Sequence, residues 1–228
     1  SRGLGDVYKR QLMHPLPAVL LVKGASMTNF PILSKKEKKE LIDLANEAAD
    51  RAREAILPYF RQNIAVSNKD EHTFDPVTEA DKAAENAIRK VISLSRPHDG
   101  IWGEETGELA SSTGFRWVID PIDGTRSFIS GTPTWGVLIS LEQIGSGPIL
   151  GIIDQPYIKE RFIGGLGTSE VRGPLGVRSL KASETQALSE SKLFTTFPEI
   201  GTEKEKMGFD AVAREVKLVR YGLDCYAS

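Results

Sequence analysis

The chain has little cysteine and little net charge, and each scarcity excludes a class of protein. A single cysteine, Cys225, excludes an intramolecular disulfide framework and fits a reducing compartment. A formal net charge of −2 gives no overall attraction to nucleic acid or to a membrane surface. No apolar run approaches the roughly 18 residues that cross a bilayer. We therefore expect a cytoplasmic globular protein without nucleic-acid or membrane partners.

The length and the N-terminus bound the domain organisation. The 228 residues suffice for one large domain or two small ones. Residues 1–26 show neither helical nor strand periodicity. A basic pair before the apolar run 16–22 imitates a signal peptide, but Pro17 interrupts the run. We expect residues 1–26 to be a non-native or disordered extension, with the native start at Met27.

Hydrophobic periodicity predicts two helices followed by a series of strands. Apolar residues recur every three to four positions from Ser34 to Pro58, and again from Thr78 to Leu94. Ser34 and Glu37 form the pattern of a capping box at the first helix. After that, short apolar or alternating runs between Gly, Pro and Ser predict strands, the later ones as an antiparallel meander. These runs are residues 100–105, 116–121, 134–143, 147–156 and 160–167.

The C-terminal part adds two more predicted strands, a helix and a final strand, at 176–184, 191–199, 202–216 and 217–222. Helices, then many strands, then helix and strand indicate a layered α+β fold. We divide it into an N-terminal α+β domain over 27–172 and an incomplete C-terminal α/β domain over 173–228.

The segment "WVIDPIDGTRSF" (117–128) places two carboxylates directly after an apolar strand. Pro121 stiffens the turn between Asp120 and Asp123, and Gly124 permits a tight backbone path. Carboxylate oxygens in such a turn suit Mg²⁺, which prefers hard oxygen ligands. The alternative is a plain turn in which the aspartates bond their own backbone.

Two further acids stand in comparable places. Glu104, in "GEE" (103–105), also follows a strand-like run, although a glutamate pair there also fits a solvated loop. Asp81, in "DPVTEAD" (75–81), fits a capping box with Thr78 at the second predicted helix. Capping and function are compatible because a helix N-terminus also favours anionic ligands.

The combination of these acids changes their interpretation. Burying the carboxylates of one helix start and two strand ends together is costly without cations. The cations of a multi-metal phosphate site would offset that cost. In such a site, two metals about 3.5–4 Å apart stabilise the attacking and leaving oxygens. Thr125, just past the turn, is placed to orient a water molecule.

The segments "VTEAD" (77–81), "GEE" (103–105) and "DPIDGT" (120–125) together resemble the signatures of the inositol-monophosphatase family. The resemblance implies a magnesium-dependent phosphatase of small phosphorylated metabolites, commonly a homodimer. It also implies a layered α-β-α-β-α sandwich of the inositol-monophosphatase and fructose-bisphosphatase type.

Other segments resemble one branch of that family, the histidinol-phosphate phosphatases of histidine biosynthesis. They are residues 125–141, 151–164, 193–200 and 221–227. We therefore expect histidinol phosphate as the substrate, with inositol 1-phosphate or another small phosphomonoester as the alternative.

The resemblance also implies the metal ligands. Glu104 and Asp120, with the backbone carbonyl of Ile122, would hold a first Mg²⁺. Asp120 would bridge to a second Mg²⁺ that Asp123 also binds. The family pattern implies two or three Mg²⁺ ions in each site.

The remaining roles concern water and substrate. By resemblance, Asp81 and Thr125 would position and activate the attacking water. The amides of Gly124 and Thr125 would face the phosphate. Gly222 and Asp224 fall where the family contacts substrate, and Asp224 could pair with the amino group of histidinol.

Two departures from the family pattern are visible. The family has a further metal-binding aspartate after the segment that 221–228 begins, and the printed chain ends before it. Leu223 stands where the histidinol-phosphate branch usually has glycine. We therefore expect a C-terminally truncated chain, and a catalytically impaired metal- or phosphometabolite-binding fragment is the alternative function.

Overall fold

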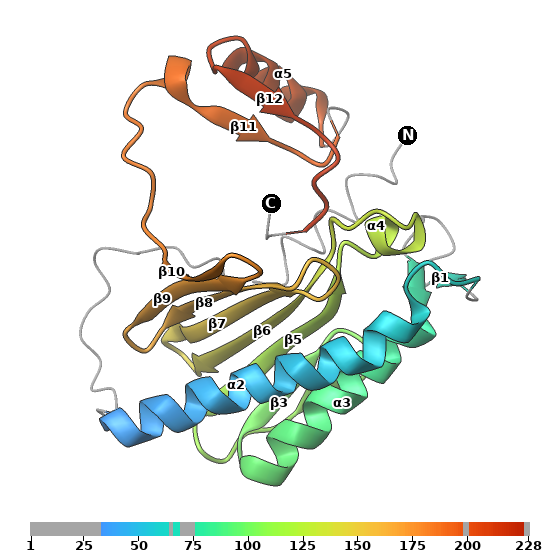
Figure 1. Ribbon diagram of the computed structural model, residues 1–228, viewed down its shortest axis with the longest axis vertical. Coiled ribbons are helices and arrows are strands. Elements are labelled where there is room, and N and C mark those ends of the chain that lie inside the picture. The colour runs from blue at the N-terminus through green and yellow to red at the C-terminus, as the bar shows by residue number, and fades with distance from the viewer. Residues whose placement is uncertain (1–32, 64–65, 69–75, 198–200, 226–228) are drawn as a thin grey trace.

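The computed structural model describes residues 33–63, 66–68, 76–197 and 201–225 (Figure 1). Residues 1–26, for which we predict an extension, lie outside the described residues. Among the described helices, none combines the length and the apolar character needed to cross a bilayer.

Two long helices, α2 (Lys35–Ile56) and α3 (Glu79–Ser95), confirm the predicted helices. Ser34 and Thr78 cap them, each in a complete capping box. The helices lie side by side across one face of a large sheet (Figure 1). Alanines on the buried faces allow this close approach: Ala45, Ala48, Ala49 and Ala52 of α2, and Ala80 and Ala84 of α3.

The sheet has eight strands in the order β10-β9-β8-β7-β6-β5-β3-β4. In chain order they are β3 (Gly100–Gly103), β4 (Gly107–Leu109), β5 (Phe115–Asp123), β6 (Gly136–Gln143), β7 (Gly147–Gln155), β8 (Glu160–Gly165), β9 (Thr168–Gly173) and β10 (Gly176–Ser179). The strands from β5 to β10 pair antiparallel, which confirms the predicted meander, whereas β3 and β5 are parallel.

Buried charges join α2 to this sheet. The carboxylate of Asp154 on β7 is fully buried. It accepts hydrogen bonds from Arg53 Nη2 on α2 at 2.6 Å and from Arg161 Nε on β8 at 2.8 Å. Because both partners are cations, the buried negative charge is matched, and the helix is held against the sheet.

The polar sequence of residues 61–77 predicts a loop, and this prediction is incomplete. Two three-residue strands, β1 (Val66–Asn68) and β2 (Pro76–Thr78), form an antiparallel pair there. Strands this short carry too few residues for an alternating pattern to be visible in the sequence.

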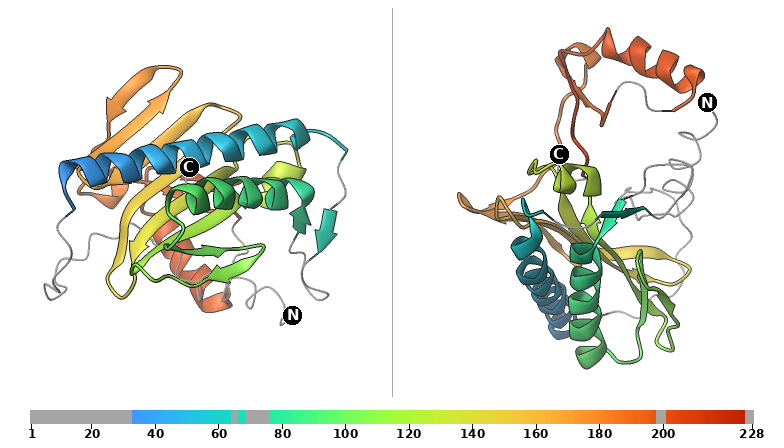
Figure 2. Two further views of the ribbon diagram at one scale, coloured as in Figure 1. Left: turned by 90° about the horizontal axis from the view of Figure 1, so that it is seen from below. Right: turned by 90° about the vertical axis from the view of Figure 1, so that its right-hand side faces the viewer.

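The C-terminal residues form a smaller unit. Strands β11 (Lys192–Phe194) and β12 (Leu218–Arg220) pair in parallel, with α5 (Glu203–Ala213) between them in the chain. This unit lies apart from the large sheet, beyond the end at which the short helix α4 (Thr125–Ile129) lies (Figure 2). Strand β10 belongs to the large sheet although it follows residue 173, and the two-domain division stays a prediction.

Candidate active site

The parallel pairing of β3 with β5 brings two of the predicted acids to the same edge. Gly103 of β3 lies opposite Ile119 of β5 in the register. The next residues along the two strands are Glu104 and Asp120. Because parallel strands end on the same side of a sheet, their carboxylates become neighbours although 16 residues separate them in the sequence.

A bulge in β5 shapes the Asp-Pro-Ile-Asp turn. Asp120 pairs with Leu138 of β6, but Asp123 pairs with Gly136, so three steps along β5 match two along β6. Residues three apart in a regular strand point to opposite faces. The extra residue of a bulge shifts this alternation and can return the second side chain to the first one's face.

Gly124 closes the turn and begins α4. Its φ of 86° lies in the left-handed region, which favours glycine. A Cβ there would lie 2.9 Å from Thr134 O and 3.2 Å from the Cβ of Asp224. Thr125, the next residue, donates its Oγ1 hydrogen to Ile122 O at 3.0 Å, which ties the hydroxyl to the carbonyl predicted as a ligand.

Asp81 is the partner of Thr78 in the capping box that the sequence indicated. Its Oδ2 accepts from Thr78 N at 2.8 Å and from Thr78 Oγ1 at 2.6 Å, and only 3% of the residue is exposed. It also lies close enough to Asp120 to raise the pKa of that carboxyl. Capping therefore places Asp81 at the predicted site rather than excluding it from the site.

Asp120 stands at the centre of these acids. Burial raises the pKa of Asp120 well above its usual range, and the charges of Glu104, Asp123 and Asp81, in that order, raise it further. Its Oδ1 is buried and has no hydrogen-bond partner among the described residues. A buried carboxylate oxygen without a donor, surrounded by other acids, is the environment that a bound cation stabilises.

The predicted ligands fit a divalent cation in chemistry, although they do not form a closed cage. In the described part of the chain, no three Asp, Glu, His or Cys side chains meet in the arrangement of a preformed metal centre. Glu104 is exposed and lies in the turn after β3, so its side chain has room to adjust. Oxygen ligands of this kind are those that Mg²⁺ takes.

The structure brings Asp224 to this turn from almost one hundred residues away. Ser127 Oγ on α4 donates to Asp224 Oδ2 at 2.8 Å, and it also lies 2.8 Å from Thr134 Oγ1. Gly222 is exposed, and its amide bonds Thr196 O at 2.8 Å. Asp224 therefore lies beside the carboxylate turn, whereas the amide of Gly222 bonds within the C-terminal unit.

Sequence reasoning missed Glu85, a fully buried acid on α3. Burial alone would raise the pKa of Glu85, but hydrogen bonds from Thr106, the Glu105 amide and Arg89 bring it below its usual value. The available signal was its position four residues after Asp81, which puts both acids on one helix face.

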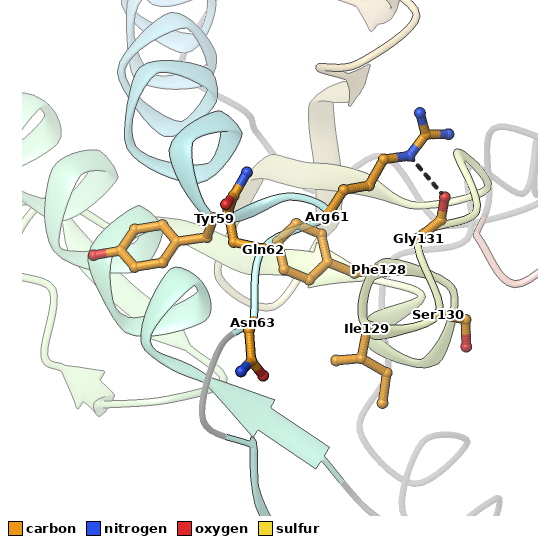
Figure 3. Close-up of a pocket in the computed structure, with 8 residues that line it drawn as sticks. All are labelled: Tyr59, Arg61, Gln62, Asn63, Phe128, Ile129, Ser130 and Gly131. Atoms are coloured by element: carbon orange, nitrogen blue, oxygen red, sulfur yellow. Dashed lines mark hydrogen bonds between the residues drawn. The ribbon is translucent and has the colours of Figure 1, made fainter.

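A surface pocket of about 510 Å³ lies between the end of α2 and the end of α4 (Figure 3). Its lining includes Arg61, whose Nε donates to Gly131 O at 3.0 Å, and the aromatic ring of Phe128. None of the predicted site residues lines it. The predicted carboxylate site and this pocket are therefore separate features of the structure.

Carboxylates gathered at adjacent strand ends suit the divalent cations that metal-dependent hydrolases use. Residues 37–221 match the sequence model of the inositol monophosphatase family, and the chain belongs to this family. The predicted α+β class is also confirmed by an inositol monophosphatase structure from Zymomonas mobilis. That structure is 36% identical with a TM-score of 0.69, and the match covers 83% of this chain and 71% of the other.

Curated relatives include both substrate branches. The chain is 39% identical to the bifunctional phosphatase IMPL2, chloroplastic, of Arabidopsis thaliana, over 89% of this chain and 60% of the relative. It is 39% identical to a histidinol-phosphatase of Chlorobaculum parvum, over 81% of this chain and 70% of the relative. It is 32% identical to inositol monophosphatase 1 of Solanum lycopersicum, over 78% of this chain and 63% of the relative. The chain thus spans less than two thirds of some of these relatives.

Proposed function

We propose that this chain carries the catalytic centre of a magnesium-dependent phosphomonoesterase that acts on a small metabolite, with histidinol phosphate preferred. The observation that carries the proposal is the buried, unpartnered Oδ1 of Asp120 among Glu104, Asp123 and Asp81. Such a cluster of acids is destabilising unless cations occupy it. Membership of a phosphatase family supports the same reaction class.

The acids divide into ligands by their positions. Glu104, Asp120 and the carbonyl of Ile122 would hold one Mg²⁺, and Asp120 with Asp123 would hold a second. We propose at most three Mg²⁺ ions, and the third would lie beside Asp81. When bound, these ions would neutralise phosphate charge and lower the pKa of a bound water.

The remaining residues would prepare the water and the phosphate. Thr125 Oγ1 already donates to Ile122 O, so its lone pairs can accept a hydrogen bond from the attacking water. Asp81, fixed by its capping bonds, would accept the proton of that water. The amides of Gly124 and Thr125 would bind phosphate oxygens, and direct attack by water needs no phosphorylated enzyme residue.

Asp224 supports the choice of histidinol phosphate over inositol phosphate. Its Oδ2 accepts from Ser127, which fixes the carboxylate beside the turn. A fixed carboxylate suits an ammonium group, which histidinol carries and inositol lacks. With Gly222, Asp224 would form the substrate side of the site.

We further propose a cytoplasmic homodimer.

The test is phosphate release with Mg²⁺ from histidinol phosphate and from inositol 1-phosphate, side by side. It is run on this chain and on a chimera extended with the C-terminal segment of the Chlorobaculum parvum relative. Faster turnover of histidinol phosphate supports the proposal. Faster turnover of inositol 1-phosphate keeps the hydrolase and overturns the substrate.

The second candidate is a non-catalytic metal- or phosphometabolite-binding unit. It is favoured by the share of the relatives that the chain spans, 60% for the Arabidopsis thaliana protein. Titration with Mg²⁺ separates the two candidates. Binding of Mg²⁺ without phosphate release from either substrate, in both the chain and the chimera, favours this second function.

A further inference from the structure

Glu85 is a buried acid for which the proposed chemistry has no role. It lies on α3, one turn after Asp81, and it is 0% exposed. A buried carboxylate requires hydrogen bonds or ion pairs to offset its lost hydration. The partners of Glu85 therefore indicate what it does.

Those partners lie mainly in the turn that carries Glu104. The Glu105 amide donates to Glu85 Oε2 at 2.7 Å, and the Thr106 amide donates to Oε1 at 3.1 Å. The Thr106 hydroxyl also donates to Oε1. One carboxylate thus binds two consecutive amides and a hydroxyl directly after Glu104.

Two neighbours complete this arrangement. Arg89 Nε donates to Glu85 Oε1 at 2.8 Å, and the same guanidinium bonds Gly107 O at the far side of the turn. A Cβ on Gly103 would lie 2.2 Å from Glu85 Oε1, so only glycine admits the carboxylate this close. The turn is therefore hydrogen-bonded directly after Glu104, and Gly103, directly before it, lies close against Glu85.

We propose that Glu85 is a positioning residue that fixes the Glu104 turn against α3, and so sets Glu104 relative to Asp81. One helix would then place both acids, the first directly and the second through hydrogen bonds. The consequence for metal affinity rests on the proposed function, because it takes Glu104 as a ligand. Residues that orient ligands in this way typically change metal affinity by about 10- to 100-fold.

Asp99 offers a matched control at the other end of β3. It is 1% exposed and accepts from Trp117 Nε1 at 3.1 Å, Thr113 Oγ1 at 2.7 Å and Arg96 Nε at 2.8 Å. It is thus as buried and as heavily bonded as Glu85. It lies before Gly100, at the end of the strand away from Glu104.

The experiment compares the full chain with its Glu85→Gln and Asp99→Asn variants, by calorimetric titration with Mg²⁺ and by thermal unfolding without metal. We expect both variants to unfold at lower temperature. Only Glu85→Gln should weaken Mg²⁺ binding, by about 10- to 100-fold. Unchanged Mg²⁺ affinity in Glu85→Gln, or equal weakening in Asp99→Asn, overturns the proposal.

A metal-free measurement separates this proposal from the function on which it rests. Hydrogen exchange at the Glu105 and Thr106 amides should be about tenfold faster or more in Glu85→Gln than in Asp99→Asn. In Glu85→Gln each of these amides loses its hydrogen bond to a charged acceptor. If this difference is found while the wild-type chain binds no Mg²⁺, the proposed function fails and the holding role of Glu85 stands. Equal exchange in both variants overturns the holding role.

Thr106 provides a milder variant in case Glu85→Gln does not fold. Thr106→Val removes the hydroxyl bond to Glu85 at nearly constant volume, and Thr106→Ser retains it. Weaker Mg²⁺ binding in Thr106→Val that recovers in Thr106→Ser supports the proposal. Equal affinity in both variants contradicts it.

Discussion

A single oxygen, Asp120 Oδ1, concentrates the conflict between stability and function in this chain. It is buried without a partner among the described residues, and neighbouring acids raise the pKa of its carboxyl. A carboxylate that destabilises the metal-free fold is explained if a cation binds to it. Removing its charge should therefore affect folding and activity in opposite directions.

Asp120→Asn should lower Mg²⁺-dependent phosphate release by about 10³-fold or more, because it removes the charge of the carboxylate that would hold both Mg²⁺ ions. The same variant should unfold at a higher temperature than wild type without metal, because it relieves repulsion from Glu104 and Asp123. Thermal unfolding in chelator and a phosphate assay measure the two effects. Asp43→Asn, on the exposed side of α2, is the control for a simple loss of charge. A destabilised Asp120→Asn would contradict the electrostatic account.

The raised pKa of Asp120 also predicts a pH dependence of stability. An acid with a higher pKa in the folded state binds more protons folded than unfolded. Its contribution therefore destabilises the fold progressively as pH rises above about 3.9, the unfolded value, toward the folded pKa. Without Mg²⁺, the stability difference between Asp120→Asn and wild type should grow with pH over that window. Saturating Mg²⁺ should remove this growth, and a pH-independent difference in chelator would contradict the prediction.

At the scale of elements, the sequence predicted both long helices and most of the strands, including the three-residue strands β11 and β12, and missed β1, β2, β4, β9 and α4. The periodicity of α2 and α3 and the runs of β5 to β8 span enough residues to show a pattern. The three-residue strand β4 and the five-residue helix α4 do not. The polar strand β9 escaped as well, since it carries one buried residue, Val171.

The site divided in the same way. Asp120, Asp123 and Glu104 were predictable because each follows an apolar run that ends a strand. The bulge within β5 and the hydrogen bonds from the Glu104 turn to Glu85 could not be predicted, because both depend on contacts between separate segments. Local sequence carries no record of such pairing.

The turn at the start of α4 gives a prediction at this scale. Gly124→Ala should destabilise the chain by about 1–3 kcal/mol and reduce activity, because Gly124 has a φ of 86° and its added Cβ would lie 2.9 Å from Thr134 O. Gly145 is a matched control, with a φ of 84° and no atom within 4 Å of an added Cβ. Gly145→Ala should cost about 1 kcal/mol and leave activity intact. Chemical denaturation measures both, and equal losses would show that backbone strain alone decides the cost.

At the scale of the whole molecule, a buried ion-pair network fixes α2 on the sheet that carries the site. Asp154→Asn should destabilise the fold by about 3–5 kcal/mol, because Arg53 and Arg161 would lose their shared buried partner. Glu170→Gln removes the partner of Arg172 at the surface and should cost less than about 1 kcal/mol. Chemical denaturation compares the two variants. A cost for Asp154→Asn as small as that for Glu170→Gln would show that other packing holds α2.

A long-range hydrogen bond of the site joins Ser127 to Asp224, which lie 97 residues apart in the chain. Asp224→Asn keeps an oxygen for the Ser127 hydroxyl and removes the negative charge. If the carboxylate binds the ammonium group of histidinol phosphate, KM for that substrate should rise about tenfold or more, with kcat nearly unchanged. KM for inositol 1-phosphate, which has no ammonium group, should change little.

Ser127→Ala provides the control for the position of Asp224. It keeps the charge and removes the bond that fixes the carboxylate, so it should raise KM for histidinol phosphate less than Asp224→Asn does. Steady-state kinetics with both substrates measures this. Equal changes in KM for the two substrates in Asp224→Asn would show that Asp224 supports the turn through Gly124 and not the substrate. The preference for histidinol phosphate would then lose its structural basis, while the carboxylate site would be unaffected.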